Sequence, residues 1–360
     1  MAHHRLGRAP GQRFRFEQYI PYLESEGYQV DLAPLLDEKQ DQTLYAQGNM
    51  LAKARLAVAT LAKRLRDVQR AKKYDLVYLY REAYLVGGAF IEKMIAQTGV
   101  PFLVDYDDAV WLPNISEGNK RWAFLKNTAK AHTIFRYATG LVAGNNYLAE
   151  YGRQFNPNVF MIPTTVDTDI YFPKPLPQKE EPIIIGWSGS PTTVQHFETL
   201  IPVLKQLKDC YGNRISFRLI GDGQYKNVEL GIEGISWSVE RELETINSFD
   251  IGIMPLPDDA WSKGKCGLKG LTYMAFEKAT VMSAVGVNQA IITDGINGFL
   301  AENKTDWLQK LSILIEDEAL RQTIGKKGRA TVVNHYSVEA NQEKYGEAIR
   351  WGIAQKNARG

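Results

Sequence analysis

The chain has 360 residues, a length that favours two domains over one. Its apolar fraction of 44% and charged fraction of 23% are ordinary for a globular protein, and a net charge of only +2 gives no electrostatic basis for binding nucleic acid. No apolar run reaches the roughly 18 to 20 residues that span a bilayer, and the N-terminus lacks the apolar core of a secretory signal. Because Cys210 and Cys266 show no metal-ligand spacing and demand no disulfide, we expect a reducing, cytoplasmic setting.

The first half of the chain alternates short apolar runs with longer helical patterns, which is typical of an α/β sheet. A doubly wound domain begins with a buried strand, but residues 5–15 are basic and loop-like, so that strand would have to lie in residues 1–4. Two interpretations stay open, a chain that begins late and lacks most of its first strand, and an irregular N-terminus. The predicted strands are 29–34, 76–80, 102–106, 140–143 and 159–162, and the predicted helices are 14–26, 43–73, 88–98 and 121–137.

A proline-rich stretch then divides the chain. Residues 171–182 contain four prolines in twelve positions, flanked by charge, which is the composition of a linker. We therefore predict two doubly wound α/β domains, at 1–170 and 183–335, with a cleft between them and ligands at the carboxyl ends of the strands. The predicted strands of the second domain are 183–187, 216–220, 235–237, 250–255 and 281–284.

Residues 185–193, Ile-Gly-Trp-Ser-Gly-Ser-Pro-Thr-Thr, run from a buried strand through small residues to the start of a helix. Glycines allow close backbone approach, Ser188 and Ser190 supply hydroxyls, and the helix N-terminus adds N–H groups and partial positive charge, so the segment can bind an anion. An N-capped turn without a ligand explains the same residues. Residues 221–223, Gly-Asp-Gly, give a weaker signal of the same kind, because this is also a common turn.

The segment from Gly264 to Thr272 follows a buried strand and a polar, Gly-rich loop. If a helix begins by Gly264, then Lys265, Lys269 and Thr272 share one of its faces, because they are spaced i, i+4, i+7. Two lysines near a helix N-terminus oppose the macrodipole, which favours acids there, so an anion between them would account for their placement. A face of solvated lysines is the alternative.

Asp105, Asp107 and Asp108 crowd the end of a predicted buried strand in the first domain. Because clustered carboxylates repel, at least one of their pKa values should be raised. The cluster suits a general base, a contact for sugar hydroxyls or a metal site, although no His or Cys pattern nearby supports a metal. A surface turn rich in Asp is the alternative.

The predicted helix near 51–73 is amphipathic and basic. A core-facing helix with a solvated basic face is one interpretation, and contact with an anionic membrane on the cytoplasmic side is the other. Its apolar stripe consists of Leu51, Ala54, Val58, Leu61, Leu65 and Val68, and its charged residues are Lys53, Arg55, Lys63, Arg64, Arg66, Arg70, Lys72 and Lys73 against the single acid Asp67.

Together these segments resemble the retaining glycosyltransferases of family four, whose GT-B fold has two Rossmann-like doubly wound domains facing a cleft. The resemblance covers nearly the whole chain and is most specific in the second domain. It implies an N-terminal acceptor domain, a C-terminal nucleotide-sugar domain, and a final helix at 336–360 that crosses back onto the first domain. The segments that carry it are 185–193, 219–223, 281–288 and 292–300, with 13–22 and 105–108 in the first domain.

The resemblance implies transfer of a hexose from a nucleoside diphosphate sugar, as co-substrate, to a glycan, lipid-linked or small-molecule acceptor. It implies retained configuration and no metal or other cofactor. The residues expected in catalysis are Asp107, Asp108, Lys265 and Lys269. The residues expected to bind the donor are Gly11, Arg13, Ser188, Gly189, Ser190, Gly221, Asp222, Gly223, Trp237, Ser238, Thr272 and Asn288.

The family carries two glutamates that hold the ribose and the sugar of the donor. This chain lacks both. Gly264 and Thr272 occupy the two positions, and Glu277 cannot replace the second, because five residues along a helix turn it roughly 140° away. We therefore expect Lys265 and Lys269 to hold the diphosphate and Thr272 to contact the ribose. A catalytically silent module that binds sugar nucleotides is the alternative function.

Overall fold

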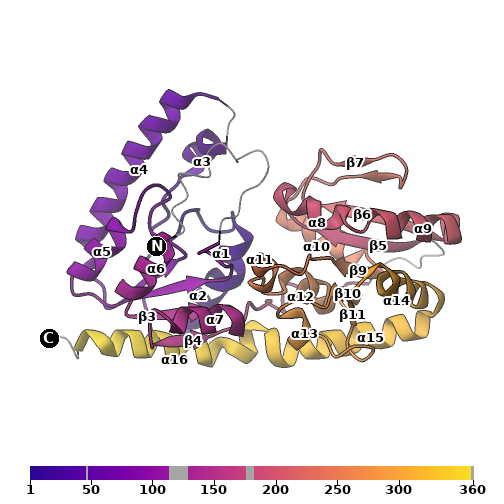
Figure 1. Ribbon diagram of the computed structural model, residues 1–360. Coiled ribbons are helices and arrows are strands. Elements are labelled where there is room, and N and C mark those ends of the chain that lie inside the picture. The colour runs from indigo at the N-terminus through magenta and orange to yellow at the C-terminus, as the bar shows by residue number, and fades with distance from the viewer. Residues whose placement is uncertain (46–47, 113–128, 176–181, 358–360) are drawn as a thin grey trace. The chain divides into compact units, whose positions relative to one another are not determined.

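The computed structural model describes residues 1–45, 48–112, 129–175 and 182–357. It divides into two compact units, one formed by Met1–Thr164 with Asn341–Gly360 and the other by Thr165–Ala340. Both are α/β units with a parallel sheet (Figure 1). Residues 121–128 of a predicted helix and 176–181 of the predicted linker lie outside the described residues.

Four parallel strands form the sheet of the first unit, in the order β1-β2-β3-β4. The predictions at 102–106 and 140–143 coincide with β2 and β3, in which every side chain is buried, as expected for a parallel sheet covered on both faces. The strand bounds are β1 (Val77–Tyr80), β2 (Phe102–Tyr106), β3 (Gly140–Ala143) and β4 (Val159–Met161).

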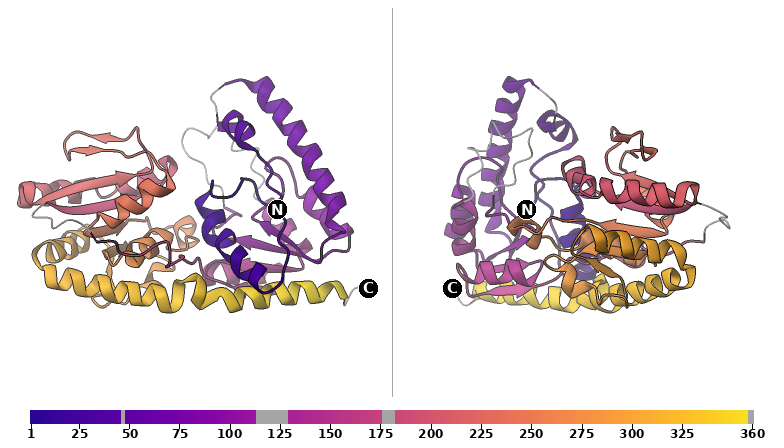
Figure 2. Two further views of the ribbon diagram at one scale, coloured as in Figure 1. Left: turned by 180° about the vertical axis from the view of Figure 1, so that it is seen from behind. Right: turned by 45° about the vertical axis from the view of Figure 1, so that its right-hand side comes forward.

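The helices of the first unit are shorter than predicted. The predicted helix 43–73 is two helices, because Gly48 and Asn49 have φ values of 74° and 47° and the Asn49 side chain caps the second by accepting from Ala52 N. Figures 1 and 2 show α4 and α5 side by side. The bounds are α1 (Pro10–Arg15), η1 (Glu17–Tyr19), α2 (Ile20–Ser25), α3 (Glu38–Tyr45), α4 (Met50–Ala71), α5 (Phe90–Gln97), α6 (Ala129–Tyr137) and α7 (Asn146–Arg153).

The buried face of α4 differs from the predicted one. The residues that face the core are Leu56, Thr60, Arg64, Val68 and Ala71. Leu51 and Val58, predicted to belong to the core-facing stripe, are 64% and 70% exposed. Arg64 is buried because its guanidinium donates to the carbonyl oxygens of Ala2, Ala33 and Ala83, so the prediction of a solvated basic face fails at this residue.

No strand forms among the described residues at 29–34, where one was predicted. Instead, Ala2 makes an isolated parallel bridge to Pro34, while the N-terminal amine of Met1 donates to Tyr78 O at 2.5 Å. Tyr80 N donates in turn to Met1 O at 3.1 Å. The first two residues therefore lie beside β1.

The last helix of the chain is α16 (Val338–Asn357), and its residues from Asn341 onward belong to the first unit. Tyr345 stacks on Tyr19 with 4.1 Å between ring centroids, and Trp351 packs edge-on against Phe160 of β4. This helix occupies the range where the resemblance implies a final helix on the first domain.

Five parallel strands form the sheet of the second unit, in the order β11-β10-β9-β5-β6. The strand predicted at 235–237 is wrong, since Ile235 makes only an isolated bridge to Ile220 and a short antiparallel hairpin, β7–β8, precedes it. The strand bounds are β5 (Ile183–Ser188), β6 (Ile215–Ile220), β7 (Lys226–Asn227), β8 (Ile232–Glu233), β9 (Ile251–Met254), β10 (Ala279–Ser283) and β11 (Phe299–Ala301).

The helices of the second unit enclose one apolar core, in which Trp187, Leu204 and Leu219 are completely buried. No described helix in either unit is both long enough and apolar enough to cross a membrane. The bounds are η3 (Pro191–Thr193), α8 (Val194–Glu198), α9 (Ile201–Tyr211), η4 (Gly212–Arg214), α10 (Val239–Asn247), α11 (Ala260–Lys263), α12 (Leu268–Ala275), α13 (Asn288–Ile291), α14 (Lys304–Glu316), α15 (Glu318–Thr331) and the π-helix η5 (Val332–Tyr336).

Candidate functional site

The strand order of the second unit reverses at β5, which has β6 on one side and β9 on the other. Ligands of open parallel sheets bind outside the carboxyl ends of the strands at such a reversal. The segment after β5 contains Ser190 and Thr193, and the segment after β9 leads to Lys265 and Lys269. The topology therefore brings two of the predicted donor-binding segments to the carboxyl ends of the neighbouring strands β5 and β9.

The two lysines lie over this end of the sheet. Lys269 Nζ lies 4.7 Å from the centroid of the Trp187 ring and 3.5 Å from Thr193 Oγ1. Lys265 Nζ lies 4.9 Å from the centroid of the Trp261 ring. Both lysines are half-buried, so part of each side chain remains open to solvent.

The pKa of His196, which lies in α8, depends on the charge of these lysines. Burial, followed by the positive charges of Lys269 and Lys265, lowers the pKa of His196 from 6.5 to about 4, and Asp259 offsets this only in part. The imidazole is therefore neutral near pH 7 and faces a positive potential. Sequence reasoning missed His196, because its neighbours in the chain show no ligand spacing.

The prediction that Lys265, Lys269 and Thr272 share one helix face is wrong. Gly267 has a φ of 72°, a left-handed conformation that interrupts the helix, and α12 begins only at Leu268. Lys265 therefore lies in the loop after α11. Thr272 is 2% exposed and its hydroxyl donates to Lys269 O at 2.7 Å, so its contact with a ribose stays a prediction.

The segment after β5 forms a capped turn, the alternative that the sequence left open. Ser190 and Thr193 form a capping box across η3, which has three residues, and α8 has only five. Such short helices carry little of the macrodipole that the anion prediction invoked. The positive charge at this edge therefore comes from the lysines.

Three glycines of the predicted donor site are required by the protein's own packing. A Cβ on Gly221, whose φ is 121°, would lie 1.4 Å from Gly189 O. A Cβ on Gly189 would lie 2.3 Å from the Trp187 ring, and one on Gly223 would lie 2.0 Å from Ser236 Oγ. These contacts explain the glycines without a ligand, so their role in donor binding stays a prediction.

We expect Gly221→Ala to lower the free energy of unfolding by about 3 kcal/mol or more, because it adds a backbone clash to an unfavourable φ. Gly231→Ala is the matched control, since its φ is 64° but nothing lies within 4 Å of the new Cβ. The control should cost only about 1 kcal/mol. Denaturant unfolding of both variants measures the difference, and equal losses would contradict the role of the Gly189 contact.

Two buried hydroxyls connect β5 to α12. Tyr273 Oη accepts from Ser188 N at 2.7 Å and lies 3.0 Å from Ser188 Oγ. Burial raises the pKa of Tyr273, so its hydroxyl stays protonated. Sequence reasoning missed Tyr273, which positions the end of β5. Its contacts occupy hydrogen-bonding groups of Ser188 that we had expected to bind the sugar nucleotide.

Other predicted donor residues lie at the same edge of the sheet. Ser238 caps α10 by accepting from Arg241 N at 3.2 Å, Asp222 Oδ1 accepts from Gln224 N at 2.9 Å, and Trp237 is half-buried. Asn288 is 1% exposed and donates to Ser283 O, while its Oδ1 has no hydrogen-bond partner among the described residues. A buried acceptor of this kind requires a partner, which a bound polar molecule or water can supply.

The three clustered aspartates of the first unit, Asp105, Asp107 and Asp108, each form an ion pair with an arginine. Arg81, directly after β1, contacts Asp107 Oδ1 at 2.7 Å and Asp108 Oδ2 at 2.5 Å through Nη2. Arg81 has a φ of 61°, unusual for a residue with a side chain. Arg15 Nε donates to Asp105 Oδ1 at 2.9 Å, in a pair that is almost completely buried. Sequence reasoning missed both arginines.

The pKa values of Asp105 and Asp107 move in opposite directions. Burial raises the pKa of Asp105, although Arg15 and Tyr78 offset part of the effect, and Asp107 contributes a minor increase. Burial also disfavours the charge of Asp107, but Arg81 and Arg15 outweigh it and lower the pKa of that carboxyl. The prediction of one raised pKa is confirmed, but the main cause is burial rather than repulsion.

Gly11 lies beside this cluster. A Cβ on Gly11 would lie 1.9 Å from Tyr80 Oη and 3.1 Å from Asp107 Oδ2, so the structure brings Gly11 and Asp107 together. Arg13, on the same short helix, places its guanidinium 5.0 Å from the centroid of the Phe14 ring.

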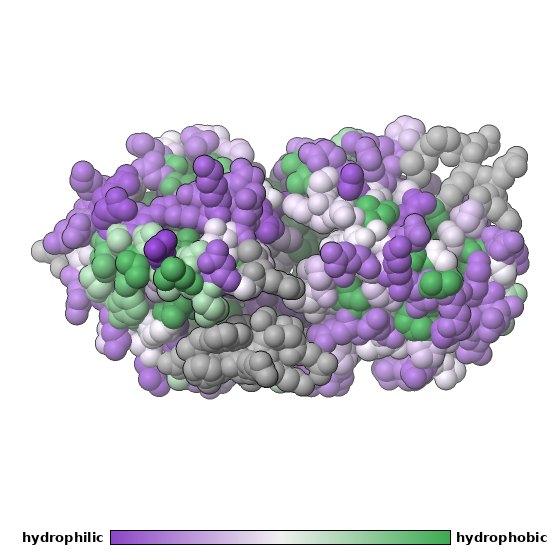
Figure 3. Space-filling view, turned by 90° about the horizontal axis from the view of Figure 1, so that it is seen from above, coloured by the Kyte–Doolittle hydropathy of each residue, from purple (hydrophilic) through white to green (hydrophobic). Residues whose placement is uncertain are grey.

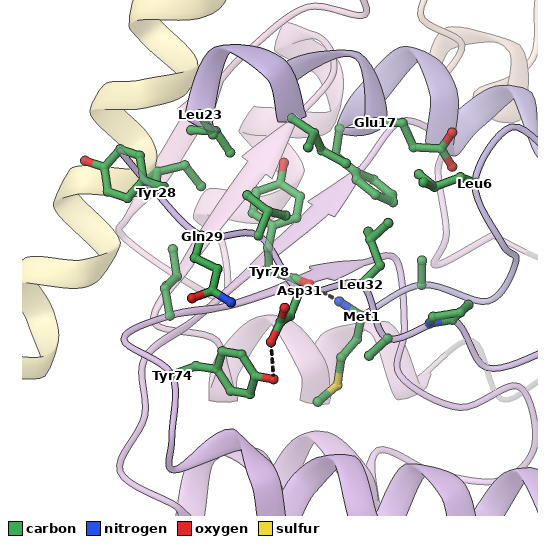
Figure 4. Close-up of a pocket in the computed structure, with 18 of the residues that line it drawn as sticks. Met1, Leu6, Glu17, Leu23, Tyr28, Gln29, Asp31, Leu32, Tyr74 and Tyr78 are labelled. Atoms are coloured by element: carbon green, nitrogen blue, oxygen red, sulfur yellow. Dashed lines mark hydrogen bonds between the residues drawn. The ribbon is translucent and has the colours of Figure 1, made fainter. Parts of the chain in front are cut away.

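A cavity of about 1020 Å³ lies elsewhere in the first unit (Figure 4). Its lining includes Met1, Leu6, Tyr28 and Leu32, and Tyr74 donates to Asp31 Oδ2 across it at 2.7 Å. None of the predicted site residues lines it. Over the described ranges, no group of three or more His, Cys, Asp or Glu side chains is placed to hold a metal ion.

Residues 182–317 match the family described as Glycosyl transferases group 1. The match covers less than half of the chain, so it describes this segment alone. A curated relative of the chain, an uncharacterized glycosyltransferase of Methanocaldococcus jannaschii, is 26% identical over 221 residues. That match covers 57% of the chain and only 59% of the relative's own length.

Solved structures show that the chain has the GT-B fold of two Rossmann-like domains. A glycosyltransferase from Rickettsia africae has a TM-score of 0.66 at 16% identity, covering 93% of both chains. Sucrose-phosphate synthase from Thermosynechococcus elongatus has a TM-score of 0.61 at 17% identity, covering 82% of this chain and 79% of its own. Anabaena HepE, in complex with UDP and glucose, has a TM-score of 0.61 at 15% identity, covering 92% and 88%. The predicted fold class is confirmed.

Proposed function

We propose that the protein transfers a hexose from a nucleoside diphosphate sugar to a glycan, lipid-linked or small-molecule acceptor, with retention of configuration. The observation that carries the proposal is the placement of Lys265 and Lys269 over the reversal point of the second sheet, where their charge helps to lower the pKa of His196 to about 4. The match of residues 182–317 to the group 1 family and the UDP and glucose in the structure of HepE support the choice of donor.

The reaction breaks the bond between the anomeric carbon and the donor diphosphate, so negative charge develops on the leaving group. Preorganised cations stabilise such charge most when they stand in place before the reaction. Lys269 is held between the Trp187 ring and Thr193, and Lys265 over the Trp261 ring. In this proposal the two lysines neutralise the diphosphate without a metal ion.

The first unit supplies the acceptor residues in this proposal. The Arg81 ion pair lowers the pKa of Asp107, which makes this carboxylate a weak base but a good hydrogen-bond acceptor. Contact of Asp107 and Asp108 with sugar hydroxyls therefore suits the geometry better than proton abstraction. Gly11 leaves room beside Asp107 that a side chain would fill.

The alternative is a module that binds sugar nucleotides without turning them over, and the absence of the expected glutamates at Gly264 and Thr272 motivates it. Calorimetry with uridine, guanosine and adenosine diphosphate sugars, followed by assays of donor hydrolysis and transfer, tests both functions. Turnover of a bound donor supports the transferase, binding without turnover supports the silent module, and no binding by any nucleotide sugar contradicts both.

We expect the pKa of His196 to rise from about 4 when inorganic pyrophosphate binds, because the anion offsets the positive charges of Lys269 and Lys265. An NMR titration of the imidazole with and without pyrophosphate measures the change. An unchanged His196 pKa at saturating pyrophosphate would place the anion elsewhere.

A further inference from the structure

The outer side of α4 exposes large apolar side chains. Met50, Leu51 and Val58 are 59%, 64% and 70% exposed, although all three lie on a helix whose other side packs into the first unit. Leu51 and Val58 are two helical turns apart, so they lie on the same side of the helix. Among the residues that the structure describes, these three side chains stay largely outside the core of the first unit.

A neighbouring loop extends the apolar surface. The hydroxyl of Tyr84 donates to Ala57 O of α4 at 2.6 Å, which places the residues after Tyr84 beside the middle of the helix. We call the combined set the apolar patch; it consists of Met50, Leu51, Val58, Leu85, Val86 and Phe90, each at least 39% exposed. Figure 3, which looks down on the N-terminal end of α4, shows apolar side chains gathered on this side of the unit with hydrophilic ones around them.

Positive charge accompanies the patch. Arg55 and Arg66 are exposed on α4, and Arg55 lies between Leu51 and Val58 in sequence. The acidic side chains that follow, from α4 and the neighbouring elements, form ion pairs or are buried. Asp67 pairs with Arg64, Glu82 with Lys130 and Glu38 with Arg5, while Glu92 is buried and accepts from Ala83 N.

We propose that the apolar patch docks the protein onto an anionic lipid surface. Apolar side chains enter the boundary between headgroups and acyl chains, while Arg55 and Arg66 reach the negative headgroups. Basic residues interleaved with apolar ones suit lipid, because long side chains extend to the headgroups while their stems stay on apolar surface. This inference does not depend on the transferase proposal.

Sedimentation of the full-length protein with vesicles tests the docking. The wild type should bind vesicles of phosphatidylcholine mixed with phosphatidylglycerol much more strongly than vesicles of phosphatidylcholine alone, and added salt should weaken the binding. Leu51→Ser with Val58→Ser should lower binding about tenfold or more. Arg55→Gln with Arg66→Gln should lower binding to the mixed vesicles while leaving the weak binding to phosphatidylcholine unchanged.

Matched controls lie on the second unit. Val228→Ser removes an apolar side chain that is 93% exposed, and Lys326→Gln with Lys327→Gln removes two exposed cations. Both controls should bind like the wild type, and all variants should keep its thermal midpoint. Absence of binding to mixed vesicles overturns the proposal, as does equal binding by the patch variants. A wild-type dimer in solution that the Leu51→Ser, Val58→Ser variant abolishes, without vesicle binding, assigns the patch to a second copy of the chain instead.

Discussion

Replacement of both Lys265 and Lys269 with alanine is expected to lower the turnover of a nucleotide sugar by about a thousandfold or more, while the fold stays intact. Removal of a single preorganised group that stabilises developing charge typically costs about 10²- to 10³-fold in rate. Both lysines are half-buried at the carboxyl ends of β5 and β9, where their charge helps to lower the pKa of His196. The double variant should also raise the pKa of His196 toward its ordinary value.

Lys263→Ala is the matched control for this variant. Lys263 lies two residues before Lys265 but is exposed and pairs with Asp258 at 3.1 Å. It should keep wild-type turnover and donor affinity. Calorimetry with UDP measures binding separately from turnover. Lysines that hold the diphosphate should affect both the affinity for UDP and the turnover of the nucleotide sugar. Near-normal turnover by the Lys265→Ala, Lys269→Ala variant would contradict the assignment.

The strands that the sequence predicted best are those buried on both faces. Residues 102–106 and 140–143 are continuous apolar runs, or nearly so, and the structure has strands with the same bounds. Parallel strands inside a covered sheet are mostly apolar, so their composition is a strong signal. The segment 235–237, Ile-Ser-Trp, is apolar at two of its three positions, but a single bridge from Ile235 to Ile220 is all that forms there.

Helix interruptions were harder to predict, because they depend on one residue's backbone. A helix that starts at Gly264 satisfies the spacing of Lys265 and Lys269, yet the left-handed Gly267 delays the start to Leu268. The lysines still converge on His196, through the loop rather than through a shared helix face. The sequence therefore identified the residues correctly as neighbours but for the wrong geometric reason.

Long-range partners were the part of the site that the sequence could not supply. Tyr273 reaches Ser188 from 85 positions away, and Arg15 reaches Asp105 from 90 positions away. A single sequence offers no signal for such pairs, because only the fold brings them together. The aspartate cluster was visible as a motif, whereas the arginines that set its pKa values were not.

The buried pair of Arg15 and Asp105 should be the most sensitive electrostatic contact of the first unit. Arg15 is 1% exposed and Asp105 is fully buried; Arg15 also donates to Ile162 O at 2.7 Å, and Tyr78 Oη donates to Asp105 Oδ2 at 2.5 Å. Asp105→Asn keeps the shape of the side chain but leaves the guanidinium buried without its counter-charge. We expect this variant to lower the free energy of unfolding by about 3 to 5 kcal/mol.

A double-mutant cycle and an exposed pair test this expectation by denaturant unfolding. Arg15→Met combined with Asp105→Asn should be less destabilised than the sum of the two single variants, because it removes both charges. Asp75→Asn is the matched control, since Asp75 pairs with Lys356 at 2.8 Å but is 72% exposed, and its loss should cost less than about 1 kcal/mol. If Asp105→Asn costs no more than Asp75→Asn, the guanidinium finds another partner and the Arg15–Asp105 contact does not stabilise the first unit.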